Sequence, residues 1–351
     1  MIREAVIVER LAVPGTVDEA GQVGDAFRAA ADFSARVRAA QWGTDAVASS
    51  PAEQLARLRD GRDARIIALV ANRAGRLVAR AVLWLPLLEE TTLIHTALLL
   101  DPDLADAERT AVLAALLDEV EAISDAESRG WLLAYAPVRA GALTPESGVG
   151  GADPAAPEAS VLLARGFALQ QVERHQLADL TAVRPPVDPP GDGYRVLAVT
   201  GRTPEELRPA LRALRPLMQT EAPTGGVPFE PQVWDEERLS EYERSSEEGG
   251  GTLVTAVALG PEGDPAGFSE LVVGQGVVVR QGDTLVVPGH RGRGLGLRLK
   301  SATLARVRGS FPEHRWVVTT NAEENTHMLA INERLGFVTA HREGMFQRLP
   351  S

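Results

Sequence analysis

The stretch from Asp283 to Val307, DTLVVPGHRGRGLGLRLKSATLARV, constrains the fold of this 351-residue chain more than any other. An apolar run ends at Pro288, closely spaced glycines follow, and apolar residues then recur at helical spacing. This pattern predicts a strand, a tight glycine turn and a helix that begins near Gly294. The amide groups at such a helix start, with the helix dipole behind them, favour a bound phosphate.

The charge of this stretch differs from that of the whole chain. Residues 283–308 carry six basic side chains and one acidic side chain, a local charge of +5, whereas the chain has 36 basic and 48 acidic residues and a net charge of −12. A basic loop on an acidic chain fits a diphosphate ligand, while the overall charge disfavours nucleic acid as a partner. The turn taken alone also fits a solvated arginine cluster, and that alternative stays open at this point.

Several other chemistries are excluded by the residues themselves. The sequence RGRGLG matches neither the G-x-G-x-x-G dinucleotide motif nor a P-loop, which needs G-K-[ST]. The chain has no cysteine, and its six histidines show no metal-ligand spacing, so we expect no metal. No apolar run approaches the ~20 residues of a membrane span, and we therefore expect a cytoplasmic protein with no membrane partner.

A Pro/Gly-rich segment divides the chain into two halves. The sequence RPPVDPPGDG at residues 184–193 predicts a stiff linker, because consecutive prolines extend the chain and forbid a helix. We expect a first domain over residues 1–183, a linker over 184–192 and a second domain over 193–351.

The two halves are predicted to share an order of elements. Arg165-Gly166-Phe167 near the end of the first half is similar to Leu335-Gly336-Phe337 near the end of the second, which indicates a divergent tandem repeat. In the first half we expect strands at 65–71, 77–85, 91–100 and 131–136 and a helix at 106–123. In the second half we expect strands at 252–259, 266–280, 283–288, 316–320 and from 337, with helices after 294 and at about 323–335.

The second half resembles the GNAT superfamily of N-acetyltransferases. Residues 291–296 match that family's R/Q-x-x-G-x-G/A signature, and Asn325, Asn332 and Gly336-Phe337 follow at the spacing of its second motif. The resemblance implies an α/β fold, more fully α+β, of two tandem GNAT-like domains. Each would be a mixed, mostly antiparallel sheet flanked by helices, and the two central strands of the C-terminal domain would be splayed apart.

The resemblance also implies acetyl-CoA as cosubstrate and names the residues that would bind it. The strand before the glycine turn would pair with the pantetheine arm, the turn would hold the pyrophosphate, and two asparagines would line the cleft. The implied cofactor-binding residues are Leu285, Val286, Val287, Arg291, Gly292, Arg293, Gly294, Leu295, Gly296, Leu297, Asn321 and Asn325.

The catalytic residues are less defined by the pattern. Glu270 and Asp283 are carboxylates near the expected cleft and are candidates for the base, although each also fits a strand residue without a catalytic role. Asn332 stands where the family often has a tyrosine that acts as general acid to the thiolate, and an amide cannot donate a proton in that sense. The chain thus departs from the family pattern at the acid.

The first half lacks the features of a cofactor loop. Where the second half has its arginine–glycine turn, the first half has four acidic residues between Asp101 and Glu108 and no glycine. Those acids would repel a pyrophosphate. We predict that this half does not bind acetyl-CoA and instead helps to shape the acceptor pocket.

The leading functional hypothesis is acetyl transfer from acetyl-CoA to the primary amine of a small molecule, by a monomer or homodimer. Two alternatives remain from the sequence: a non-catalytic acyl-CoA-binding protein, and acetylation of a protein amine. The sequence does not identify the acceptor.

Overall fold

The computed structural model describes residues 5–183 and 192–350. The expected linker at 184–192 lies outside the described residues except for Asp192, so the predicted domain boundaries stay a prediction. The first half contains β1 (Val6–Arg10), α1 (Gln22–Trp42), η1 (Asp45–Val47), α2 (Pro51–Arg57), β2 (Ala64–Arg73), β3 (Arg76–Pro86), β4 (Leu93–Leu100), α3 (Asp106–Ala126), β5 (Trp131–Pro137), α4 (Pro157–Ala164) and β6 (Ala168–Asp179). The second half contains β7 (Arg195–Thr200), α5 (Arg208–Leu214), η2 (Arg215–Leu217), α6 (Met218–Glu221), α7 (Glu236–Glu248), β8 (Thr252–Leu259), β9 (Pro265–Val273), β10 (Val278–Val286), η3 (Pro288–His290), α8 (Leu295–Ser310), β11 (Trp316–Ala322), α9 (Thr326–Arg334) and β12 (Val338–Arg348).

The described strands form one 12-stranded sheet in the order β1-β2-β3-β4-β5-β12-β6-β11-β10-β9-β8-β7. Most neighbours are antiparallel, but β4 runs parallel to β5 and β10 runs parallel to β11. Each half therefore contributes a mixed, mostly antiparallel sheet with one parallel pair, in agreement with the fold class expected from the sequence.

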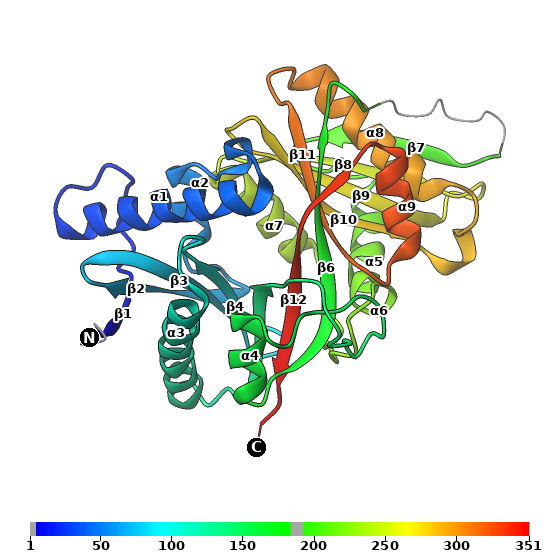
Figure 1. The fold of residues 1–351 in the computed structure, drawn as a ribbon. Helices are drawn as coiled ribbons and strands as arrows, with labels where there is room; N and C mark the ends of the chain where they lie inside the picture. Colours follow the sequence, from blue (N-terminus) through cyan, green and yellow to red (C-terminus); the bar gives the residue numbers. More distant parts are fainter. Residues whose placement is uncertain (1–4, 184–191, 351) are drawn as a thin grey trace.

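The two halves exchange their last strands at the centre of the sheet. Strand β6 ends the first half but pairs with β11 of the second, while β12 ends the second half and pairs with β5 of the first. The two exchanged strands also pair with each other over most of their length, side by side in the middle of the molecule (Figure 1). Each half therefore supplies one strand that pairs with the strands of the other half. Neither half has its full set of strand pairings without the other.

The helices of the second half cover opposite faces of its strands. Leu271 and Val273 of β9 pack in one apolar cluster with Leu304 and Val307 of α8. Phe268 points to the other face and packs against α5 and α7. This alternation follows from the period of two in a strand, which sends successive side chains to opposite faces.

Two element boundaries differ from the sequence prediction. The strand expected at 266–280 is two strands, because the chain turns between Val273 and Val278 and returns as β10. Strand β10 then continues through an irregularity in its pairing after Gln281 and ends at Val286, before Pro288 opens a short 3-10 turn. The helix expected from about 323 begins at Thr326 instead, because the Asn325 side chain caps it.

Within residues 5–183 and 192–350, none of the helices combines the length and the apolar character that a membrane crossing requires.

Candidate active site

The parallel pair β10 and β11 separates along its length and opens a cavity. The two strands pair only from Val278 to Arg280, opposite Trp316 to Val318. Beyond Arg280, β10 keeps its partner β9 on one edge, and its other edge has no strand partner among the described residues. A cavity of about 820 Å³ lies there, lined by residues from both faces of the sheet. The splay expected in the second half is therefore present.

The glycine turn between β10 and α8 forms one wall of this cavity. Gly292 and Gly294 have φ values of 78° and 71°, a left-handed backbone that glycine adopts without strain. No side chain caps the start of α8 at Gly294, so the first amides of the helix lack a side-chain acceptor. Gly296 packs so closely on Ile331 of α9 that an added Cβ would lie 2.9 Å from its Cδ1 atom. The turn thus forms part of the cavity wall, and the binding of a phosphate by its amides stays a prediction.

The arginines of the turn have partners within the chain. Arg291 donates to the carbonyl of Val286 at 3.1 Å and forms an ion pair of 2.7 Å with Glu221 of α6. Arg293 lies over the ring of Tyr194, with 5.5 Å from its guanidinium carbon to the ring centroid. Arg291, Gly292, Gly294, Leu295 and Gly296 line the cavity, as do Leu285 and Val286, whereas Val287, Arg293 and Leu297 are not among its lining residues.

Two of the predicted asparagines also lie in the cavity wall. The Asn325 side chain accepts a hydrogen bond of 3.2 Å from the Met328 amide at the start of α9. The Asn321 side chain accepts one of 2.7 Å from Asn332. Both therefore have internal partners, and their contacts with a cofactor stay predictions.

Two carboxylates open onto the cavity without hydrogen-bond or ion-pair partners in the described part of the chain: Asp283 of β10 and Glu173 of β6. The Asp283 side chain is exposed where it lines the cavity, yet the surrounding protein displaces water from it and so raises its pKa; Arg215 opposes this shift and Glu270 adds to it. Burial also raises the pKa of Glu173 to about 7, although His175 nearby favours the charged form. A carboxylate whose pKa lies near 7 can take up a proton in a reaction at neutral pH.

Glu270, the other carboxylate expected at the cleft, is enclosed on β9. It is 1% exposed, and its Oε2 atom lies 2.5 Å from Nη2 of Arg215, which is also buried. The Tyr242 hydroxyl donates to Oε1, and Thr255 donates to Oε2 at 3.3 Å. Among the described residues Glu270 does not line the cavity, and its carboxylate instead neutralises a buried arginine.

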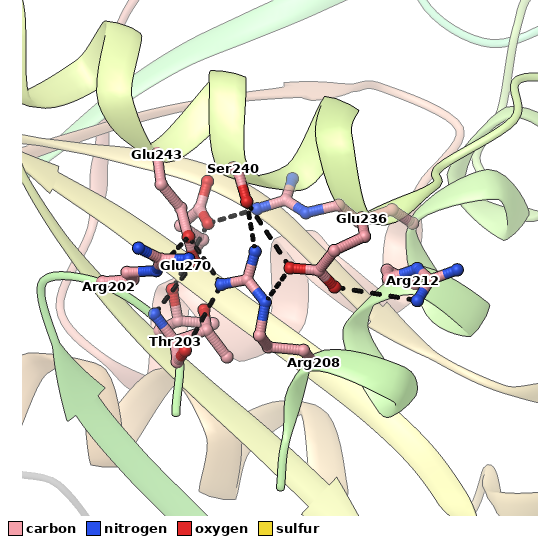
Figure 2. Close-up of polar contacts among 10 residues, drawn as sticks. Arg202, Thr203, Arg208, Arg212, Glu236, Ser240, Glu243 and Glu270 are labelled. Atoms are coloured by element: carbon pink, nitrogen blue, oxygen red, sulfur yellow. Dashed lines mark hydrogen bonds and ion pairs between the residues drawn. The ribbon is translucent and has the colours of Figure 1, made fainter. Parts of the chain in front are cut away.

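The helices that cover this face of the sheet are joined by a second buried arginine. Arg208 of α5 is 1% exposed and lies between Glu236 and Glu243 of α7 (Figure 2). Its guanidinium contacts these two carboxylates at 2.5 and 2.8 Å and the Ser240 hydroxyl at 2.8 Å. Because these contacts join α5 to α7, they fix the position of Arg215, which follows directly after α5.

The matching turn of the first half is closed by its own side chains. Asp101 is fully buried and accepts hydrogen bonds from Arg36, Arg76 and the Asp103 amide. Burial alone would raise the pKa of Asp101, but these bonds outweigh it and lower the pKa to about 2. Arg36 and Arg76 compensate the charge of Asp101, and the expectation that this half binds no acetyl-CoA stays a prediction.

A histidine pair lies on the exchanged strands beside Glu173. His175, His341 and Glu343 offer ligand atoms within 4.8 Å of one another. The two rings are stacked, however, with centroids 4.3 Å apart and planes 10° apart, and Nε2 of His175 lies 3.0 Å from Oε2 of Glu343. A metal lies in the plane of each imidazole that binds it, and near-parallel planes do not converge on one ion. The stacked rings therefore fit a metal site poorly.

Glu173 and Lys300 are among the cavity residues that the sequence did not predict as part of the site. Glu173 belongs to the first half and reaches the cavity because β6 is exchanged into the second sheet. Lys300 was counted only as part of the basic stretch, yet it is 1% exposed and lines the cavity. Its signal in the sequence was that it is the only lysine in a chain whose other basic residues are arginines.

The comparisons with known proteins agree with this architecture. No family model matches the chain. The streptothricin acetyltransferase of Streptomyces lavendulae is 34% identical over 119 residues, which are 32% of this chain and 60% of that protein's length. A solved tandem GNAT protein from the clavulanic acid biosynthesis pathway has a TM-score of 0.72 at 24% identity and covers 99% of both chains. A GCN5-related N-acetyltransferase from Sphaerobacter thermophilus has a TM-score of 0.62 at 15% identity, covering 98% of this chain and 95% of that one.

These findings establish the fold. The chain has the tandem GNAT fold over nearly its whole length, with the glycine turn and the splayed strands in its second half. The fold does not identify the reaction, which is inferred from the residues of the cavity.

Proposed function

We propose that this protein is an acetyl-CoA-dependent N-acetyltransferase that acts on the primary amine of a small molecule by direct transfer. One observation carries the proposal: the cavity between β10 and β11 joins the glycine turn to two carboxylates that have no partner among the residues the structure describes. The amides of residues 292–297 would hold the diphosphate and the unpaired edge of β10 the pantetheine arm. When bound, acetyl-CoA would supply an activated acetyl group as its thioester.

The carboxylates give the cavity the chemistry that an amine acceptor requires. An alkylammonium has a pKa near ~10.4, so presenting it as a neutral nucleophile at pH 7 costs about 4–5 kcal/mol unless a base assists. Asp283 and Glu173 would attract the cation and accept its proton. Glu173 joins Asp283 as a candidate base, while the ion pair of Glu270 with Arg215 leaves it better suited to holding Arg215.

A small-molecule acceptor is supported by the relative whose name denotes acetyl transfer to streptothricin. The match spans 60% of that relative's length. The acceptor in the relative's name therefore suggests a class of compound for this chain and does not identify its substrate. We therefore propose an antibiotic-like amine, amino sugar, amino acid or polyamine as acceptor.

Calorimetric titration with acetyl-CoA tests cofactor binding. We expect one site per chain in the wild type and none in Gly294→Trp, whose side chain would fill the turn. Gly263→Trp is the matched control, because Gly263 also has a left-handed backbone, with φ of 88°, in an exposed turn between β8 and β9. Two sites would show that the first half binds cofactor, and no binding to the wild type would end the proposal.

Thiol release with a panel of amines tests the reaction. The chain has no cysteine, so Ellman's reagent reports only free coenzyme A. Turnover with one class of small amine would support the proposal. Binding without turnover on any amine would favour the non-catalytic alternative, and turnover only with peptides would favour protein acetylation. The pH dependence of the rate should be compared for Asp283→Asn, Glu173→Gln and the wild type. The variant that lacks the true base should lose the fall in rate at acidic pH.

A further inference from the structure

Lys300 is a buried cation without a carboxylate partner. It lies on α8, is 1% exposed, and forms no ion pair with any residue in the described ranges 5–183 and 192–350. Its ammonium nitrogen lies 2.6 Å from Oδ1 of Asn332, and the Phe337 ring centroid is 5.5 Å away. An ammonium group has three donors, and Asn332 accepts one of them. A buried cation with so few partners is costly, and such groups gather at functional sites.

Asn332 holds this ammonium in a fixed direction. The asparagine is completely buried, and its Nδ2 atom donates to Gln176 of β6 at 2.9 Å and to Asn321 of β11 at 2.7 Å. With both amide hydrogens used, only Oδ1 faces Lys300, and an ammonium can only donate to it. The pair therefore joins both parts of the molecule: β6 comes from the first half, and β11 and α9 from the second.

We propose that Lys300, positioned by Asn332, is the general acid that protonates the departing thiolate of coenzyme A. The inference rests on the proposed acetyl transfer and assigns the acid that the chain lacks where related proteins often have a tyrosine. Lys300 and Asn321 both line the cavity in which the cofactor would lie.

The step balances as follows. The amine nitrogen forms a bond to the thioester carbonyl carbon, the carbon–sulfur bond breaks, and its electron pair passes to sulfur. The Lys300 ammonium gives one proton to that sulfur and becomes a neutral amine. The acceptor nitrogen enters as an ammonium and loses two protons through the carboxylates of the cavity, one before the attack and one after the carbon–nitrogen bond has formed. One of these protons restores the Lys300 ammonium by way of water, and the other leaves to solvent, so that both groups return to their starting states.

The acidity of Lys300 suits this role. Burial lowers the pKa of Lys300 to about 7. An ordinary thiol has a pKa near ~8.5, so transfer of a proton from this ammonium to a thiolate is favoured by a factor of about 30. An exposed lysine, with a pKa near ~10.4, would instead hold its proton against the thiolate.

The decisive measurement uses the fact that the chain has one lysine. Protein labelled with ε-¹³C lysine gives a single side-chain NMR signal, which is titrated alone, with coenzyme A, and with desulfo-coenzyme A. We expect a lysine pKa near 7 in the free protein, a rise of about one unit or more with coenzyme A, and no such rise with the desulfo compound. Equal pKa values with both ligands would overturn the inference.

The same design separates this inference from the proposed function. If neither ligand binds in calorimetry, the acetyltransferase proposal itself fails. If both bind but the lysine signal does not distinguish the sulfur, only the role of Lys300 fails. No variant has to fold for this test, because the wild-type protein is the sample.

Kinetics provide a second test. Lys300→Met, which preserves the length of the side chain, should lower kcat by about 100-fold, the lower end of the range for general acid catalysis, with little change in KM for acetyl-CoA. The decrease in kcat of Lys300→Met should be smaller for thioesters with more acidic leaving thiols, because these thiolates leave without a general acid. Adding Asn332→Tyr should recover part of the rate. Arg244→Met removes an exposed cation of α7 as control and should leave the rate unchanged. A loss that is equal for all leaving groups would contradict the proposal.

Discussion

Replacing the buried lysine should change the free energy of unfolding in a way that depends on pH. The Lys300 pKa falls from 10.5 in the unfolded chain to about 7 in the folded protein because burial disfavours the ammonium. Below pH 7 the group is charged in both states, and the folded protein pays the full cost of about 5 kcal/mol. Between pH 7 and 10.5 only the unfolded chain holds the proton, so wild-type stability rises with pH through this window.

Lys300→Met removes this cost but leaves Oδ1 of Asn332 without its donor. A buried acceptor left without a partner costs roughly 1–3 kcal/mol. The variant should therefore be more stable than the wild type at pH 6.5 by about 2–4 kcal/mol. That advantage should shrink by about 3 kcal/mol between pH 7 and 9.5, and the sign should reverse between about pH 8 and 10.

Urea unfolding of the wild type and the variant at pH 6.5, 8 and 9.5 measures this difference. Arg244→Met is the control, since its guanidinium is half exposed on α7. A difference between Lys300→Met and wild type that stays constant over the three pH values would refute the reasoning, because it would mean that Lys300 titrates alike in both states.

Three further predictions follow from the packing. Glu270→Gln should lower the free energy of unfolding by roughly 3–5 kcal/mol, because Arg215 is left as an uncompensated buried charge; urea unfolding of Glu270→Gln beside the wild type measures it. Gly267→Ala should lower the free energy of unfolding by at least about 1–3 kcal/mol, since the added Cβ would lie 2.4 Å from the Leu285 carbonyl oxygen. A melting temperature equal to that of the wild type would contradict this. Removal of residues 338–351 should abolish cooperative unfolding of the whole chain, because β12 pairs with both β5 and β6; circular dichroism would detect a surviving folded half.

The sequence by itself predicted the part of the site that is local. The strand, the glycine turn and the helix of residues 283–310 lie next to one another in the chain, so apolar periodicity and glycine spacing suffice to place them. The tandem order of elements was visible for the same reason. The fold class was implied by the resemblance of residues 291–337 to the GNAT motifs, which are likewise local in the sequence, whereas the role of the turn in cofactor binding stays a prediction.

The tertiary structure decided the features that join distant residues. Glu173 reaches the cavity only because β6 crosses into the second sheet, and Asn332 contacts Gln176 across 156 positions of sequence. Glu270 pairs with Arg215 over 55 positions. Periodicity shows that a side chain is buried but not what it is buried against, since strand pairing depends on the free energy of the whole sheet. For that reason the carboxylates of the cavity, the strand exchange and the partner of Lys300 belong to the tertiary structure alone.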